Sequence, residues 1–470
     1  MLSSDKIDLL QNFLGKLPAD VAARLARAIE VDRLVEGKAL PHETILDGLR
    51  PVLRTGDAAQ RTPTPLRLFC RPFEDLLINT PRTDKQKGCI LRGHVVPVWQ
   101  WLSQHLIAEQ VKAYSVDIRS LVVAAKFSAA LARAEQFWPE AGKAMHDALL
   151  HNQKKVLPLL GGEAVAADAW DMAIVLMSGS AMLAVQALLP KGTPGLNEEL
   201  LWGLRHVYDS VAESNLDAAP LISVVAMRRL TKPWEALKLA LLIARQSGDA
   251  LISSTDMGLA GDVLFSDMEN ARLAIMAMRH PVFDENALIA HLTTFTDISS
   301  AIVKEVEILR SGKWGQRLLK DRAAVASLME TFMERAPKEI SAALPTHKAG
   351  YSGGPRVPDF GRPADPDRAA RALRYARVLS GSKILAVPGS FGARHQNAMD
   401  DVTQLLRSYS EDTLKELRTA EGPRREVVRQ QFFLVLELFT LLFEESETEF
   451  LRRRGKAAGA ELQPETPAVM

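Results

Sequence analysis

The amino-acid sequence predicts a mainly α fold, a multi-helix bundle or irregular helical array with a C-terminal helical module. Ala, Leu and Met recur throughout long windows, and apolar residues return at the three- and four-residue spacing of helices. Alternation of polar and apolar residues is scarce. The strand-like stretches are short, at residues 88–96 and 383–387, and neither has an obvious hairpin partner.

Composition limits the class of protein and the kind of partner. The chain has 470 residues, of which 47% are hydrophobic and 24% charged, which suffices for two or three cores and excludes disorder over most of the length. Its formal net charge is +1, so no global field attracts a polyanion or an anionic lipid surface. An anionic partner would therefore have to bind a local patch.

Three features predict a cytoplasmic protein without transmembrane insertion. Two cysteines, Cys70 and Cys89, are too few for a secreted disulfide framework, and both are expected to be reduced. Residues 1–8 carry acids where a signal peptide needs basic residues. The 17 uncharged residues from 173 to 189 lie at the lower limit for a membrane span and are better explained as a buried central helix.

The N-terminal part divides into two regions. Residues 1–54 predict three short helices, one after Ser3 and Ser4, one from about 19 to 35, and one starting at Pro41. Residues 55–95 form a basic, Pro-containing connection, and from 50 to 92 nine Lys or Arg face four Asp or Glu. A solvated connection is the favoured interpretation, and an anion-binding arm is the alternative.

Residues 96–344 are predicted to form the main helical body. Within it, apolar residues follow a four-three spacing from Leu288 to Leu309, and the same spacing recurs from Leu318 to Ala336. A five-residue break separates the two seams. Two helices with matching seams and a short connection are expected to fold back on each other as an αα-hairpin.

Residues 345–366 contain nine Pro or Gly among 22 and are predicted to be a flexible linker and the main domain boundary. The C-terminal helical module follows at 367–455, with helices near 367–380, 396–408, 410–420 and 423–454. Residues 456–470 are predicted to be a disordered tail.

Familiar catalytic spacings are mostly absent from the sequence. It contains no His-Glu-x-x-His, no Gly-Lys-Ser/Thr phosphate loop and no Cys-x-x-Cys. Residues 389–392 superficially resemble a phosphate-binding glycine loop, but an interhelical turn is favoured. The pair His146 and Asp147 invites a metal phosphohydrolase interpretation at a frequency close to chance. We therefore predict no cofactor and no metal, and the sequence leans away from an enzyme.

One cluster stands out as a candidate binding site. Between the two seam helices, cations surround a tryptophan at a predicted hairpin tip, and Asp321 is the only acid from 310 to 322. Such a tip could bind phosphate of a nucleic acid, anionic lipid or an acidic protein surface. The alternative is a structural turn, with the tryptophan packed on a neighbouring helix. The candidate residues are Arg310, Lys313, Trp314, Arg317, Lys320 and Arg322.

The predicted function is that of a cytoplasmic binding or scaffold protein acting through protein–protein contacts, because apolar helical seams dominate and catalytic spacings are missing. The first alternative is a binder of nucleic acid or of an anionic surface through residues 50–92 and the 310–322 tip. The second is an enzyme with an unrecognised helical active site. Self-association into a homo-oligomer stays open.

Overall fold

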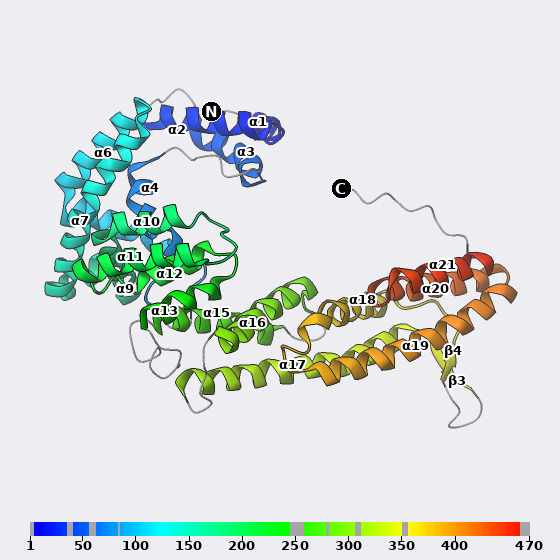
Figure 1. The fold of residues 1–470 in the computed structure, drawn as a ribbon. Helices are drawn as coiled ribbons and strands as arrows, with labels where there is room; N and C mark the ends of the chain where they lie inside the picture. Colours follow the sequence, from blue (N-terminus) through cyan, green and yellow to red (C-terminus); the bar gives the residue numbers. More distant parts are fainter. Residues whose placement is uncertain are drawn as a thin grey trace. The chain divides into compact units, whose positions relative to one another are not determined.

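The protein is mainly α in a computed structural model, as the sequence predicts (Figure 1). The structure describes residues 4–34, 41–55, 63–82, 85–244, 258–278, 282–305, 312–349 and 356–460. These residues form two compact units, one within 1–246 and 255–263 and the other within 247–254 and 264–470. The division falls inside the predicted main body and not at the predicted linker.

The first unit begins with the three helices that the sequence predicts. They are α1 (Ser4–Leu14), α2 (Ala19–Leu34) and α3 (His42–Thr55). Both α1 and α2 pack against α3, around a small core of Leu14, Ala22, Ala26 and Leu49. Apolar residues three or four positions apart place one face of each helix in this core.

The described part of the predicted basic connection is largely a core segment, which corrects the favoured interpretation. It forms α4 (Pro65–Cys70), the 3₁₀-helix η1 (Arg71–Leu76), a pair of parallel two-residue strands, β1 (Leu77–Ile78) and β2 (Ile90–Leu91), and the 3₁₀-helix η2 (Arg92–His94). Phe69, Phe73 and Leu76 are fully buried. Pro65 and Pro72 lie in the first turn of a helix, where the backbone N–H that proline lacks would have no partner within the helix. The prolines therefore shape a buried segment.

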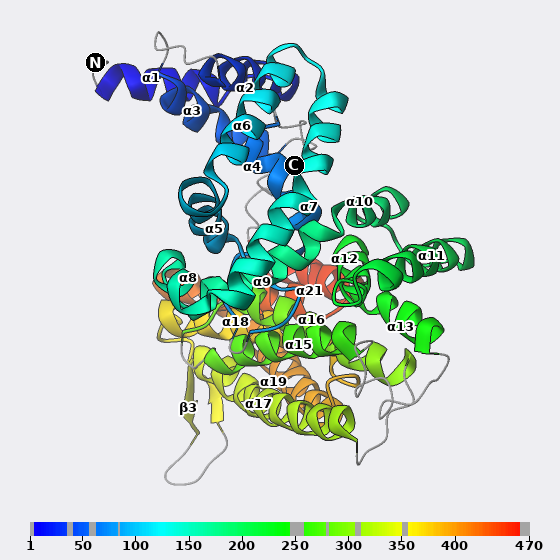
Figure 2. The ribbon, with the colours of Figure 1, turned by 90° about the vertical axis from the view of Figure 1, so that its left-hand side faces the viewer.

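The remaining elements of the first unit surround this segment (Figure 2). Trp138 donates its indole N–H to the Leu68 carbonyl at 3.1 Å, and Tyr114 donates to the Pro65 carbonyl at 3.0 Å. The elements are α5 (Val95–Trp101), the π-helix η3 (Leu102–Leu106), α6 (Ala108–Val123), α7 (Phe127–His151), α8 (Gln153–Leu160), α9 (Glu163–Met177), α10 (Gly179–Leu188), α11 (Glu198–Ser214), α12 (Leu221–Arg229), η4 (Pro233–Ala236) and α13 (Leu237–Ala244).

The second unit is built on one long helix, α17 (Lys313–Ala343), which packs chiefly against α18 and α19. Its elements are α15 (Leu259–Ala277), which straddles the division, α16 (Glu285–Glu305), α17, β3 (Thr346–Lys348), β4 (Arg356–Pro358), α18 (Pro366–Gly381), the 3₁₀-helix η6 (Lys383–Leu385), α19 (Gly392–Thr419), α20 (Gly422–Leu442) and α21 (Glu445–Ala457). The predicted strand at 383–387 is therefore wrong, since η6 begins there.

The seams of α16 and α17 are used differently from the predicted αα-hairpin. α16 packs on α18, and α18 is also the main neighbour of α17. Aromatic rings join these elements. The ring centroid of Phe332 on α17 lies 6.0 Å from that of Tyr375 on α18 and 5.1 Å from that of Phe283, which precedes α16. A seam predicts that a helix face is buried but does not identify the helix that covers it.

Part of the predicted flexible linker is fixed to the C-terminal module. β3 and β4 pair antiparallel, and the fully buried Gln431 of α20 donates to the carbonyls of Asp359 at 2.9 Å and Arg362 at 2.7 Å. The Gln431 side-chain oxygen accepts a hydrogen bond from Tyr409 at 2.9 Å. These three hydrogen bonds satisfy the buried Gln431 side chain, and two of them fix the path of the chain at Asp359 and Arg362, before α18.

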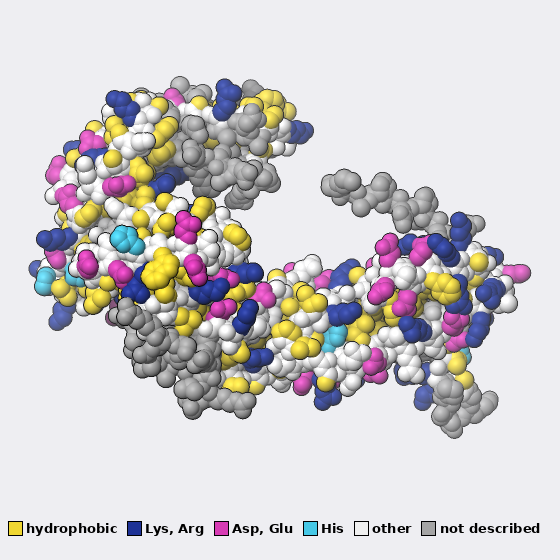
Figure 3. All heavy atoms as spheres, in the orientation of Figure 1, with side chains coloured by type: hydrophobic (Ala, Val, Ile, Leu, Met, Phe, Trp, Pro, Cys, Tyr) yellow, Lys and Arg dark blue, Asp and Glu magenta, His cyan; other side chains and the backbone are white. Residues whose placement is uncertain are grey.

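The helices of the C-terminal module differ in length from those predicted. α19 is continuous through both helices predicted at 396–408 and 410–420, whereas the helix predicted at 423–454 divides into α20 and α21. Figure 3 shows cationic and anionic side chains interspersed over α20 and α21. Arg453 pairs with Glu449 one turn earlier at 3.0 Å. The disordered tail predicted from residue 456 begins later than expected, because α21 continues to Ala457, and Ala458 and Ala460 are buried. Residues 461–470 lie outside the described residues.

Candidate protein-binding groove

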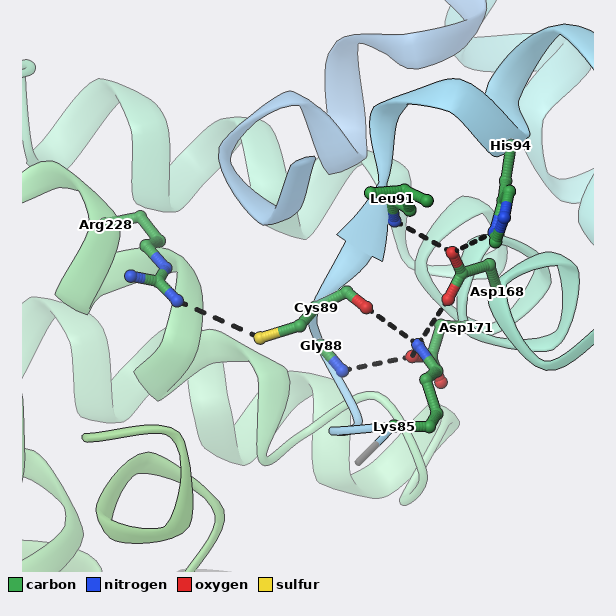
Figure 4. A network of polar contacts seen from close by, with 8 residues as sticks. All are labelled: Lys85, Gly88, Cys89, Leu91, His94, Asp168, Asp171 and Arg228. Carbon is green, nitrogen blue, oxygen red and sulfur yellow. Dashed lines mark hydrogen bonds and ion pairs between the residues drawn. The ribbon is translucent and has the colours of Figure 1, made fainter. Parts of the chain in front are cut away.

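The groove between α10 and α11 depends first on how α9 is held. Asp168 and Asp171 are three residues apart on α9, which places them on one helix face, and they are only 3% and 4% exposed. Lys85 lies between them, with its Nζ 2.6 Å from Asp168 Oδ1 and 2.7 Å from Asp171 Oδ2 (Figure 4). The burial of two carboxylates is tolerated because an ammonium group compensates their charge.

Backbone groups complete this network. Asp171 accepts from the Gly88 N–H at 3.1 Å, and Asp168 accepts from the Leu91 N–H at 2.8 Å and contacts His94 Nδ1 at 2.7 Å. Lys85 also donates to the Cys89 carbonyl at 2.8 Å (Figure 4). Burial opposes the ammonium charge, but the carboxylates outweigh it and raise the pKa of Lys85. The polar groups are engaged with one another, so the network positions α9.

A sharp bend at Ser178 ends α9 and starts α10. The two helices meet at 76°, and Asn215 supports the break by donating to the Ile174 carbonyl at 3.2 Å and to Ser178 Oγ at 3.0 Å. Gly179 is required here, because a Cβ at this position would lie 2.6 Å from the Trp138 ring. The predicted single helix at 173–189 is therefore two helices.

The two halves of this uncharged stretch have different environments. The Ala173–Leu176 part of α9 is buried, whereas Ala181, Leu183 and Ala184 of α10 are only half-buried. None of the described helices is by itself long and apolar enough to span a membrane, and α9 and α10 satisfy that test only as a bent pair. α10 thus presents apolar side chains beyond those that the core covers.

α11 runs beside α10 and forms the second wall of the groove (Figure 1, Figure 2). The helices are in contact where Leu188 lies 3.3 Å from the position of a Cβ on Gly203. Toward the bend the two helices line a groove of about 390 Å³. Mostly small side chains leave this space open. The lining residues are Met177, Ser178, Ser180, Ala181, Ala184, His206, Val207, Ser210, Val211 and Ser214.

The rim of the groove combines exposed apolar residues with acids. Trp202 is 63% exposed and lies one turn before His206 on α11, and Leu216, just past the end of α11, is 64% exposed. Glu213 and Asp217 are exposed and form no ion pair with a described residue. Figure 3 shows apolar and acidic side chains together over α11. An exposed tryptophan beside an open groove is typical of a binding anchor.

The predicted basic tip is arranged differently from an exposed aromatic platform. Trp314 is 1% exposed and packs against Phe265, with ring centroids 5.6 Å apart. Arg317 lies over the same ring and pairs with Glu269 at 2.7 Å. The expectation that Trp314 offers its plane to a ligand is therefore not met, and the tryptophan instead fills the junction between α15 and α17.

The remaining residues of the tip fall into three groups. Arg310 lies outside the described residues. Lys313 and Lys320 are exposed on α17. Arg322 donates to the Pro388 carbonyl at 3.0 Å and reaches Ser390 Oγ at 3.4 Å, so it contacts the turn between α18 and α19. Trp314 is buried, and Arg317 and Arg322 contact other elements, so the five described candidates do not form one exposed binding surface.

The predicted anion-binding arm keeps exposed cations in its described part, among them Arg67 and Arg71. Lys85 pairs with Asp168 and Asp171, and Arg92 contacts Glu74 at 3.3 Å and Asn79 at 3.1 Å, so acids offset part of the charge of the arm. His146 lies against Trp170 with ring centroids 4.6 Å apart and planes tilted by 38°, and its Nδ1 is 3.6 Å from an Asp147 carboxylate oxygen. Among the residues that the structure describes, no group of three His, Cys, Asp or Glu could hold a metal ion.

The sequence contained a signal for the groove. The uncharged run at 173–189 is followed by an amphipathic helix that carries Trp202. Comparisons of the chain with protein-family models, curated proteins and solved structures gave no match. The geometry of the groove is therefore the basis on which a function can be inferred.

Proposed function

We propose that this protein is a helical scaffold whose first unit holds a helix of a partner protein in the groove between α10 and α11. The observation that carries this proposal is the half-buried apolar face of α10, which borders an open groove of about 390 Å³ next to the exposed Trp202. Small residues such as Ala181, Ala184 and Ser210 permit close approach of a helix backbone.

The electrostatics favour one chemical class of partner. α10 carries no charge, while Glu213 and Asp217 supply acids at one side of the groove. An amphipathic helix with small or apolar residues on one face and Lys or Arg beside it fits this combination. Because both cysteines are free and buried, we also propose that the protein works in a reducing compartment, the cytoplasm.

Paired arginine variants test the groove. Ala184→Arg places a long cation in the groove, whereas Ala129→Arg makes the same change at an exposed site on α7. Affinity capture from native lysate, quantified by mass spectrometry, should lose partners only with Ala184→Arg. We expect at least a tenfold decrease, because the apolar contact is replaced by a buried charge.

Photo-crosslinking identifies what occupies the groove. A photoreactive amino acid at Ser210, which lines the groove, should crosslink to a segment with an apolar helical face and flanking basic residues. Equal capture by wild type, Ala184→Arg and Ala129→Arg would contradict the proposal. So would crosslinks to segments that are acidic or that lack an apolar face.

A further inference from the structure

The ten residues 382–391 connect α18 and α19 as a tightly closed turn, which we call the apolar turn. Leu385 N–H donates to the Ser382 carbonyl at 3.0 Å, Gly389 N–H to Leu385 at 2.8 Å and Phe391 N–H to Ala386 at 3.0 Å. Leu385, Ala386 and Phe391 are 6%, 3% and 1% exposed and attach the turn to the core of the second unit. Backbone hydrogen bonds within the turn and the buried side chains together fix the backbone of the turn.

Two residues show how little freedom this turn has. A Cβ on Gly389 would lie 2.5 Å from the Phe391 ring and 2.8 Å from the Leu385 carbonyl oxygen, so no larger residue fits. Ser390 has a φ of 65°, a left-handed conformation that is unfavourable for residues other than glycine. Such a conformation persists only where the surrounding contacts impose it. The apolar turn is therefore preformed before any ligand binds.

This rigid turn directs aliphatic side chains into solvent. Ile384 is 82% exposed and Val387 is 80% exposed, the highest values among large hydrophobic side chains in the described part of the chain. The two residues are three positions apart in the apolar turn, with Ile384 in the 3₁₀-helix η6 and Val387 two residues past its end, and we treat them as an aliphatic pair. Neither contributes appreciably to the core, and a polar residue would satisfy the fold equally well.

Cations lie next to the aliphatic pair. Lys383 belongs to the apolar turn and is exposed, and it forms no ion pair with a described residue. Arg322 of α17 contacts the turn through Pro388 and Ser390, and Lys320 is exposed two residues earlier. On α19, Arg394 is 53% exposed, with Glu334 at 3.9 Å as its only close acid among the described residues. Cations thus exceed acids around the exposed aliphatic pair.

We propose that the apolar turn binds an anionic lipid surface. Ile384 and Val387 enter the boundary between headgroups and acyl chains, while Lys383 and Arg322 contact lipid phosphates. This inference concerns the second unit and does not depend on the groove in the first. The sequence predicts that Lys320 and Arg322 bind an anionic surface together with Trp314. In the present proposal they do so together with the apolar turn.

Lipid fits this surface better than two other anionic partners. A single-stranded nucleic acid is bound by stacking on aromatic rings, but Trp314 is buried and the exposed pair is aliphatic. A stable protein interface buries about 800 Å² on each partner, far more than two aliphatic side chains provide. A lipid layer accepts individual apolar side chains, with weak and reversible binding as the result.

Vesicle sedimentation with the full chain tests this inference. Wild type should partition more strongly onto vesicles that contain phosphatidylserine than onto vesicles of phosphatidylcholine alone. Ile384→Ser with Val387→Ser should weaken the binding by about 100-fold, roughly tenfold for each aliphatic group. Lys383→Gln should weaken it by about fivefold, and only on the anionic vesicles.

The matched control is Val282→Ser with Val303→Ser, which removes two valines of the second unit that are 76% and 50% exposed. These variants should bind vesicles as wild type does, and all four proteins should unfold at the same urea concentration. Equal binding by both double variants would overturn the inference. The inference would also be wrong if wild type does not bind anionic vesicles, or if it binds DNA or heparin instead of lipid.

A fluorescent label tests whether the turn itself enters the lipid. Val387→Cys introduces an exposed thiol, whereas the native Cys70 and Cys89 are buried and react slowly. An environment-sensitive dye at position 387 should shift its emission to shorter wavelengths on anionic vesicles. The same dye on Val282→Cys should show no shift. A shift from both positions, or from neither, would contradict insertion of the apolar turn.

Discussion

At the scale of single residues, Cys70 shows how burial controls chemistry in the first unit. Its thiol is 6% exposed, and burial, assisted by the charge of Glu74, raises the pKa of Cys70 to about 12 from the ordinary 9.0. Burial likewise raises the pKa of the neighbouring Tyr114. The neutral thiol suits an apolar contact and is a poor nucleophile at physiological pH.

The raised pKa predicts a loss of stability at alkaline pH. Above about pH 9 the thiol ionises in the unfolded chain but stays protonated in the folded one, so unfolding releases a proton and is favoured as pH rises toward 12. The effect of Cys70 alone reaches on the order of 4 kcal/mol when the thiol is fully ionised. Urea unfolding of wild type and Cys70→Ala measures it.

The Cys70→Ala variant should lose less stability than wild type between pH 9 and 12, although it starts from a lower stability because of the cavity. Cys70 should also resist iodoacetamide at pH 8 in the folded protein. Parallel pH dependences for the two proteins would show that the thiol does not experience the burial described above.

Single residues also show why the candidate site was only partly predictable. The cations around Trp314 were visible as a pattern, but Glu269 and Phe265, which cover Arg317 and the indole, lie about 50 residues earlier on another helix. Long-range neighbours of this kind leave no local trace in a sequence. Arg322 is likewise 66 residues from Pro388 of the apolar turn that it contacts.

At the scale of elements, helix existence was predictable and helix ends were less so. Capping and spacing predicted α1 to α3, because local side-chain preferences decide such short helices. The bend between α9 and α10 was missed, since it is imposed by Trp138 against Gly179 and by Asn215 from the end of α11. Tertiary contacts therefore decide where an uncharged run breaks.

Gly179 provides the test at this scale. Gly179→Ala should lower the free energy of unfolding by about 1–3 kcal/mol, because the added methyl group overlaps the Trp138 ring. Gly203→Ala is the control on α11, the other wall of the groove, since its methyl group would meet only the end of the Leu188 side chain at 3.3 Å. Chemical denaturation should show little change for this control or a slight gain from better helix propensity.

A change of similar size in both glycine variants would refute the assignment of Gly179 to the bend. Partner capture adds a second measurement. If α10 is displaced by the overlap, Gly179→Ala should also reduce capture through the groove, while Gly203→Ala should not.

At the scale of the whole molecule, the boundary between compact units was the main difference from expectation. Residues 345–366 are rich in Pro and Gly, which is typical of linkers, yet α17 before them and α18 after them share an extensive buried face. Tyr375 of α18 contacts Phe332 of α17, and the buried residues of α18 also include Ala372, Ala376 and Leu379. Composition describes the local chain and does not reveal which helices it joins.

Two fragments of the chain distinguish a boundary near residue 264 from a boundary at residues 345–366. Residues 258–470 keep α15 to α21 together and should unfold in one cooperative urea transition. Residues 345–470 lack α17, so the apolar face of α18 would be exposed to water, and we expect a shallow transition and binding of a hydrophobic dye. If 345–470 unfolds cooperatively while 258–470 does not, the Pro- and Gly-rich segment is the boundary. The contacts of Phe332 with Tyr375 would then be secondary to the folding of the C-terminal module.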